Sequence, residues 1–283
     1  MVKHYRFAGL EFQIEMEDAL MYREERRLAP FAVESVEDPH HFRFEVVEEL
    51  PEPTGNQLTK QPAFAVYGLE DGHVRYIGSG EFALRAEHRG RNHFVQVKKN
   101  AYTHTIGTKT VLECMAIEHL IARNHGFIFH CSYIDRNGKA ILFTAPSETG
   151  KSTQAELWKR LRGAEIINGD RAVVRLVDGV LMAEGIPFSG SSTYCENRSL
   201  PIEAIVYLGQ APETTIRKMH GYEAFARVWE GVSVNTWDKE DMETVSRVVQ
   251  TIAEQIPVFH LPCTPDESAV IALEKMLRKQ ESL

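Results

Sequence analysis

The chain has 283 residues, of which 43% are hydrophobic and 25% are charged, and its formal net charge at pH 7 is -8. This length allows one large domain or two modest ones with a buried core, and the composition is that of an ordinary globular protein. The negative net charge argues against duplex nucleic acid as the main partner, so we expect no nucleic-acid binding.

Residues 1 to about 100 alternate apolar and polar side chains in a way that predicts β-strands. Apolar residues fall at roughly every second place in HYRFAGLEFQIE, and the pattern returns in HFRFEVV. Two short alternating runs flank Asp71-Gly72, a dipeptide typical of tight hairpin turns. We therefore expect a β-rich N-terminal region over residues 1–105, and its role is not indicated by the sequence.

From residue 106 onward the period changes, and we expect a second domain with an α/β pattern over 106–283. A helical spacing of apolar residues predicts a helix over 110–124. FIF at 127–129 and KAILFT at 139–144 have the composition of buried strands. The remaining predicted elements are a helix at 151–161, strands at 164–168, 171–177, 180–183 and 204–209, helices at 221–230 and 239–255, a strand at 257–261 and a helix at 265–279.

The cysteines and the N-terminal residues bear on the cellular compartment. The four cysteines lie far apart and form no CxxC pair, which favours reduced thiols over a disulfide framework or a zinc site. The N-terminal stretch MVKHYRFAGLEFQIE has no apolar segment of signal-peptide type, and no apolar run of membrane-spanning length occurs. We expect a cytoplasmic protein with no membrane partner.

The stretch after the 139–144 strand has the pattern A-x-x-x-x-G-K-S-T and leads directly into an amphipathic helix. In this context successive backbone N–H groups form an anion-binding concavity, and the positive end of the helix dipole adds to it. Gly150 permits close approach of the backbone, Lys151 can reach the β- and γ-phosphates, and the Ser152 hydroxyl can ligate Mg²⁺. Thr153 can touch the α-phosphate. The motif therefore predicts a phosphate-binding loop for ATP or GTP with Mg²⁺.

Two residues of this loop depart from the usual pattern. Ala145 stands at the first glycine position, which costs little if its φ is negative. Glu148 places a carboxylate near the expected phosphates. Its side chain points outward, or it acts close to the transferring phosphoryl group, or it weakens nucleotide binding by repulsion, and these three interpretations stay open.

Four further residues are candidates for the chemistry around the loop. Asp170 follows the strand after the helix, which returns it to the loop as a metal-linked acid or as the base for an acceptor hydroxyl. Glu184 is a second candidate metal ligand. His130, at the end of the predicted 127–129 strand, can face the phosphates if its strand pairs with that of the loop. Arg198 can clamp a phosphate or the acceptor. The alternatives are a turn aspartate, a structural histidine and a surface arginine.

Several motifs together resemble one known family. These are HCS at 130–132, NGKAILFTAPSETGKST at 137–153, IINGD at 166–170, GIPFSG at 185–190 and ENRSLPIEAIVYL at 196–208. Over roughly residues 125 to 262 the chain resembles the HPr kinase/phosphorylase-like P-loop family, whose core is similar to that of phosphoenolpyruvate carboxykinases. The resemblance implies an α/β fold (α+β overall), with such a core following a β-rich N-terminal region.

The resemblance also implies roles for individual residues. Phosphates would lie on the loop, Mg²⁺ on Ser152, and His130 and Asp170 would form an acid/base pair beside the catalytic Lys151. Family members commonly have two adjacent acids where this chain has Gly169-Asp170, and Glu148 replaces the usual glycine. One hypothesis is that Glu148 restores the missing carboxylate. The loop residues expected to contact the nucleotide are Ser147, Glu148, Thr149, Gly150, Lys151, Ser152 and Thr153.

The leading functional hypothesis is a kinase that transfers the γ-phosphoryl group of ATP or GTP to a hydroxyl of a protein, a peptide or a small molecule. Carboxykinase-like decarboxylation and phosphate-driven dephosphorylation are alternatives on the same core. A third alternative is a non-catalytic nucleotide- or peptide-binding protein with a degenerate loop. The acceptor, the choice between adenine and guanine, and assembly into a homo-oligomer are left open by the sequence.

Overall fold

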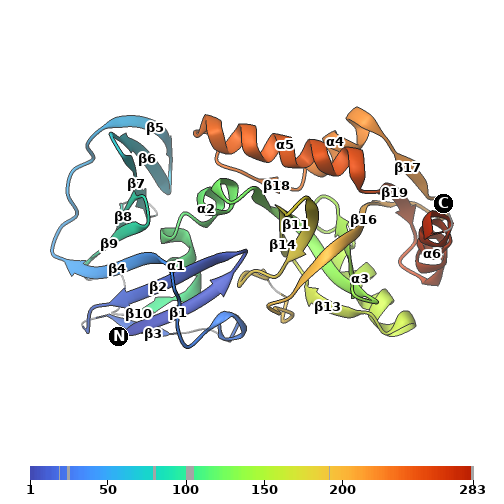
Figure 1. Cartoon of the computed structure of the whole chain (residues 1–283), viewed down its shortest axis with the longest axis horizontal. Helices are drawn as coiled ribbons and strands as arrows, with labels where there is room; N and C mark the ends of the chain where they lie inside the picture. The colour runs from blue at the N-terminus through green and yellow to red at the C-terminus, as the bar shows by residue number, and fades with distance from the viewer. Residues whose placement is uncertain (19, 24–25, 79–80, 100–104, 191, 282–283) are drawn as a thin grey trace. The chain divides into compact units, whose positions relative to one another are not determined.

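The computed structural model describes the whole chain except residues 19, 24–25, 79–80, 100–104, 191 and 282–283 (Figure 1). The fold is mixed α/β, and the chain divides into two compact units, Met1–Ile117 and Glu118–Leu283. We call them unit 1 and unit 2. Among the described residues, every helix is too short or too polar to cross a membrane.

Unit 1 is built on an eight-stranded sheet in the order β1-β2-β4-β9-β8-β7-β6-β5. The alternating pattern of the sequence is confirmed there, because Tyr5, Phe7, Phe12 and Phe42 are all at most 3% exposed. The strands are β1 (Val2–Phe7), β2 (Leu10–Met16), β4 (His40–Val47), β5 (Asn56–Gln61), β6 (Phe64–Leu69), β7 (Gly72–Ile77), β8 (Leu84–Arg89) and β9 (Asn92–Lys98).

The rest of unit 1 is small. Strands β3 (Met21–Arg23) and β10 (Thr105–Gly107) form a short parallel pair, and a 3₁₀ turn covers Ala29–Phe31. Helix α1 (Thr108–Cys114) follows β10 directly and contacts β8. The β6–β7 hairpin closes through Glu70 and Asp71, at the position where the sequence predicts a hairpin turn.

Unit 2 is built on a nine-stranded sheet with two long strands, β11 (Gly126–Arg136) and β16 (Ser199–Gln210), which are labelled in Figure 1. The first half of β11 pairs with β14, and its second half pairs with β12. Strand β16 pairs first with β15 and then, in parallel, with β12 and β19. The other elements are α2 (Ile117–Arg123), β12 (Lys139–Thr144), α3 (Lys151–Arg162), β13 (Glu165–Asn168), β14 (Arg171–Val177), β15 (Val180–Glu184), β17 (Arg217–Met219), α4 (Gly221–Trp229), β18 (Val232–Ser233), α5 (Lys239–Gln255), β19 (Val258–Cys263) and α6 (Glu267–Glu281).

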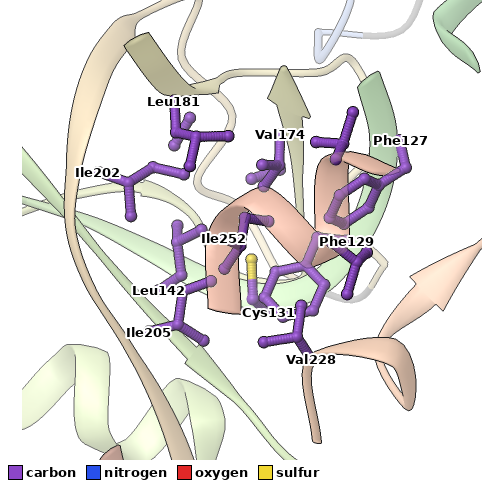
Figure 2. Close-up of a cluster of buried hydrophobic side chains, with 14 of the residues drawn as sticks. Phe127, Phe129, Cys131, Leu142, Val174, Leu181, Ile202, Ile205, Val228 and Ile252 are labelled. Carbon is purple, nitrogen blue, oxygen red and sulfur yellow. The ribbon is translucent and has the colours of Figure 1, made fainter. Parts of the chain in front are cut away.

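Two hydrophobic cores hold unit 2 together. Helices α4 and α5 contribute Val228 and Ile252 to the first, where they meet apolar side chains of β11, β14 and β16, and Figure 2 shows Phe129 and Cys131 among them. Helices α3 and α6 contribute to the second, around the fully buried Trp158. Burial of apolar surface on both sides explains why the strands shared by these cores have almost continuous apolar runs.

Two strands and one helix differ from the sequence prediction. Strand β16 begins at Ser199, five residues before the predicted strand at 204–209. Strand β11 does not end at 129 but continues through His130 to Arg136. The helix predicted over 110–124 is broken, because Ala116 adopts a left-handed conformation with φ +52° between α1 and α2. The segment 111–122 is apolar on nearly all sides, so one straight helix would leave an apolar face unburied. The break coincides with the division between the two units.

Candidate functional site

The predicted phosphate-binding loop lies at the carboxyl end of strand β12. It leaves β12 after Thr144 and enters helix α3 at Lys151. Strands β12, β16 and β19 are parallel neighbours, so their carboxyl ends lie along one edge of the sheet. In open α/β sheets, ligands bind outside this edge. The loop therefore has the strand–loop–helix context that a phosphate site requires.

The backbone of the loop is compatible with an anion-binding concavity. Gly150 has φ +114° and precedes the first residue of α3, and no side chain caps the helix start. The first N–H groups of α3 therefore remain available to an anion, as the geometry of a helix N-terminus dictates. Ala145 lies outside the left-handed region, so its methyl group costs no strain, whereas Glu148 has φ +63°. A glycine would adopt that conformation without strain.

Lys151 is folded back onto the loop. Its Nζ donates to the carbonyl oxygens of Ala145 at 3.1 Å and Pro146 at 3.2 Å, and the residue is only 8% exposed. Burial lowers the pKa of Lys151, and the charge of Asp170 partly opposes this effect. The Lys151 ammonium group is therefore bound by two carbonyl oxygens of the loop and not by a buried ion pair.

Asp170 and His130 lie next to the start of α3. The Ser152 hydroxyl donates to the Gly169 carbonyl at 3.3 Å, which joins the helix start to the turn carrying Asp170. One carboxylate oxygen of Asp170 lies 3.4 Å from Nε2 of His130, and the other accepts from Nε of Arg171 at 3.2 Å. The interaction with His130 is the main cause of a lowered pKa of Asp170. The structure thus brings His130, Lys151, Ser152 and Asp170 together.

Two cavities flank the start of α3. The first, of about 570 Å³, is lined by Glu148, Thr149, Gly150 and Thr153, together with residues after β16 and at the end of β19. The second, of about 310 Å³, lies on the side of Ser152 and Asp170. A polyphosphate on the loop would therefore have space for a nucleoside on one side and for an acceptor on the other.

Other predicted site residues lie away from this cluster or take no part in its contacts. The Glu184 carboxylate accepts two hydrogen bonds from Arg175, at 2.8 and 3.1 Å. Arg198 pairs with Asp135 and Glu165. Ion pairing within unit 2 therefore occupies both side chains, and neither belongs to the group around Lys151. Ser147 is an exposed residue of the loop.

The space beside Gly169 is filled by a side chain from another segment, which the sequence does not reveal. A Cβ atom at Gly169 would lie 2.2 Å from the Ser192 hydroxyl oxygen and 2.6 Å from its Cβ. Ser192 also accepts a hydrogen bond from the Tyr194 backbone N–H at 3.2 Å and lines the smaller cavity. An acid at 169, as in the family that the sequence resembles, would require Ser192 to move.

Sequence reasoning missed part of the lining of the larger cavity. Gln154 is 2% exposed and donates from Nε2 to Sγ of Cys263 at 3.4 Å. The residues 209–212 and 263–265 come from the turns after β16 and β19. The available signal was positional, since strands predicted at 204–209 and 257–261 would end beside the loop if they ran parallel to 139–144.

Comparison with known proteins gives a family match and likenesses to solved structures. Residues 96–277 match the family model described as SynChlorMet cassette protein ScmC. The solved structure of the Hpr(Ser) kinase/phosphatase from Coxiella burnetii is similar at a TM-score of 0.32 and 13% identity, over 54% of this chain and 90% of that chain. A search of curated proteins gives no match.

Proposed function

This chain belongs to the family of SynChlorMet cassette protein ScmC, and we propose that it is a nucleotide-dependent phosphotransferase. It moves the γ-phosphoryl group of ATP or GTP to a hydroxyl of a protein, a peptide or a small molecule. The four cysteines are buried and form no disulfide, which fits the reducing cytoplasm as the site of action.

One observation carries the proposal. A Gly-Lys-Ser-Thr loop lies at the carboxyl end of a parallel strand, and the side chains of Lys151, Ser152, Asp170 and His130 gather at the start of the helix that follows. Chance occurrences of the four-residue motif are common, but they lack this strand–loop–helix context and a converging acid and imidazole.

The groups around the loop have different roles in phosphoryl transfer. The N–H groups at the start of α3 and the Lys151 ammonium bind and orient the phosphates, and positioning with electrostatic stabilisation supplies most of the rate in such reactions. Asp170, with its lowered pKa, stays ionised and orients the acceptor hydroxyl. The His130 imidazole, with Nε2 3.4 Å from that carboxylate, is a second group placed to take up the proton of the acceptor.

The donor set near the loop fits a magnesium ion. Mg²⁺ prefers oxygen ligands and commonly takes one or two carboxylates together with substrate phosphates. The Ser152 hydroxyl and the Asp170 carboxylate both line the smaller cavity and would hold the ion, whereas the Arg175 pairing of Glu184 argues against that residue as a ligand. When bound, the ion would neutralise charge on the phosphates.

Transfer from γ-labelled ATP or GTP to serine-containing peptides and small alcohols tests the proposal. We expect label to move to a hydroxyl in the presence of Mg²⁺, and Lys151→Met to abolish the transfer. Lys139→Met removes the same charge from an exposed position of unit 2 and is the matched control. Nucleotide binding without any transfer or hydrolysis would reject the catalytic part of the proposal.

A second candidate function is nucleotide binding without catalysis. The observation that favours it is the position beside Asp170, where Ser192 lies so close that a side chain at Gly169 would have to displace it. A binding protein of this kind would bind ATP with Mg²⁺ and transfer or hydrolyse none of it, in the wild type as in the Asp170→Asn variant. A phosphotransferase would lose turnover in that variant.

A further inference from the structure

Four histidines of unit 1 form a row across four neighbouring strands of its sheet. His73, His88 and His93 lie directly opposite one another on β7, β8 and β9, and His40 follows on β4. Nδ1 of His88 lies 3.0 Å from Nδ1 of His93, and Nε2 of His93 lies 3.0 Å from Nδ1 of His40. The rings of His73 and His88 stack with centroids 4.7 Å apart. We call these residues the imidazole row.

Three of the four imidazoles of the row are shielded from water. His73, His88 and His93 are at most 5% exposed, and the Phe42 ring stacks on His93 with centroids 4.1 Å apart. Burial is the main cause that lowers the pKa of His40 to about 4. A charged imidazole is therefore costly at this place, since its hydration is lost.

The charged groups around His40 act on its pKa in both directions. Arg91 and His41 lower the pKa of His40, and Asp38 alone raises it. On β7 the buried Arg75 follows two residues after His73, on the same face of the strand, and its guanidinium donates to the Glu113 carbonyl of α1 at 3.5 Å. Beside it, Cys114 of α1 is fully buried with a raised thiol pKa and carries no charge at neutral pH.

Proton counting shows how the row responds to acid. Each imidazole–imidazole bond needs one N–H donor and one bare nitrogen as acceptor. His93, which makes two such bonds, can hold one extra proton and donate to both neighbours. A second extra proton, on His40 or His88, protonates a nitrogen that has to accept. Two N–H groups then face each other, and that hydrogen bond is lost. The three hydrogen-bonded histidines, His40, His88 and His93, therefore keep their bonds with at most one extra proton in the folded protein. In an unfolded chain the same three histidines take up three protons.

We infer that the imidazole row is an acid-sensitive latch, which holds β4, β9 and β8 together at neutral pH and releases these strands at mildly acidic pH. Histidines with a lowered folded pKa contribute stability that is complete above pH ~6.5 and is lost as the pH falls below that value. At least two protons are taken up on opening, three minus one. The opening constant then rises about a hundredfold per pH unit between pH ~6.5 and the folded pKa values.

Amide hydrogen exchange on the full chain, followed by mass spectrometry and corrected for intrinsic rates, tests the inference. Between pH 7.5 and 5.0 we expect peptides from β4, β8 and β9 to lose protection by about a thousandfold. This figure follows because the opening constant rises about a hundredfold per pH unit over the 1.5 units between pH ~6.5 and pH 5.0. Peptides from β12 and β16 of unit 2 should lose far less. Unchanged protection of the unit 1 strands at pH 5.0 would overturn the inference.

A matched pair of variants assigns the effect to the row. His93→Gln removes the central ring and should flatten the pH dependence. His41→Gln changes the neighbouring exposed histidine of β4, the weakest of the charged groups acting on His40, and should leave most of the pH dependence in place. If His93→Gln does not fold, ring resonances of the wild-type chain decide by NMR. Rings of His40, His88 and His93 that take up three protons near pH 6.5 while unit 1 stays folded would refute the latch.

Discussion

Lys151→Met separates binding from folding more sharply than any other substitution in the loop. Methionine keeps the length of the buried side chain and removes its charge. Because burial lowers the pKa of Lys151, the folded protein disfavours the ammonium form relative to water, despite its bonds to the Ala145 and Pro146 carbonyls. The free energy of unfolding of unit 2 at pH 7 should therefore equal or exceed that of the wild type.

Nucleotide binding should move in the opposite direction. A charged hydrogen bond from lysine to phosphate contributes about 1.5–3 kcal/mol, and each 1.4 kcal/mol is a factor of ten in affinity. We expect the affinity for ATP with Mg²⁺ to fall by about 10- to 100-fold. The wild type should also gain stability as the pH rises toward ~10.5, because the unfolded chain then binds more protons at Lys151 than the folded one. The variant should lack this gain.

The assays are calorimetric titration with ATP and urea denaturation followed by tryptophan fluorescence, which reports on unit 2 because the three tryptophans are Trp158, Trp229 and Trp237. Lys139→Met controls for the change in net charge. Wild-type affinity in Lys151→Met would refute the phosphate role of the lysine. A large loss of stability would instead show that its carbonyl bonds are structural.

Three further changes probe the departures in the loop and its neighbours. Glu148→Gly and Glu148→Gln should both raise affinity for ATP with Mg²⁺ about two- to fivefold, because an exposed charge facing phosphates is worth under ~1 kcal/mol; unchanged titrations would exclude repulsion. Gly169→Ala should destabilise unit 2 by about 1–3 kcal/mol in urea denaturation, because the added Cβ overlaps Ser192. Adding Ser192→Gly to that variant should cancel the loss. Additive losses in the double variant would contradict the overlap. Because its pKa is lowered in the folded protein, the Asp170 carboxylate stabilises unit 2 above pH ~4 and does so less as the pH falls below that value. Asp170→Asn should therefore make the stability of unit 2, followed by tryptophan fluorescence, fall less steeply in acid. An unchanged fall would disprove this contribution.

Local sequence patterns predicted the elements around the site well. The helix predicted at 239–255 is α5 with the same bounds, and the strand at 139–144 is β12. Gly163 ends α3 in a left-handed conformation with φ +68°, as a helix-terminating glycine should. These features depend on neighbours in sequence, through periodicity, caps and turn residues, which a single chain displays directly.

Features that depend on distant neighbours could not be predicted in the same way. The length of β11 follows from pairing its two halves with different strands, and no local signal marks that change of partner. Arg198 resembles a phosphate clamp in sequence, yet Asp135 and Glu165 bind it. Ser192 fills the space beside Gly169 from a segment more than 20 residues away in sequence. Tertiary pairing decides each of these cases.

The central claim is that the loop between β12 and α3 binds the polyphosphate of a nucleotide. Calorimetric titration of the full chain with ATP and GTP, with and without Mg²⁺, tests it most directly. The account predicts saturable binding of at least one nucleotide, strengthened by Mg²⁺ and weakened by inorganic triphosphate as a competitor. Absence of binding to either nucleotide at millimolar concentration, in a chain whose unit 2 is folded, would contradict it.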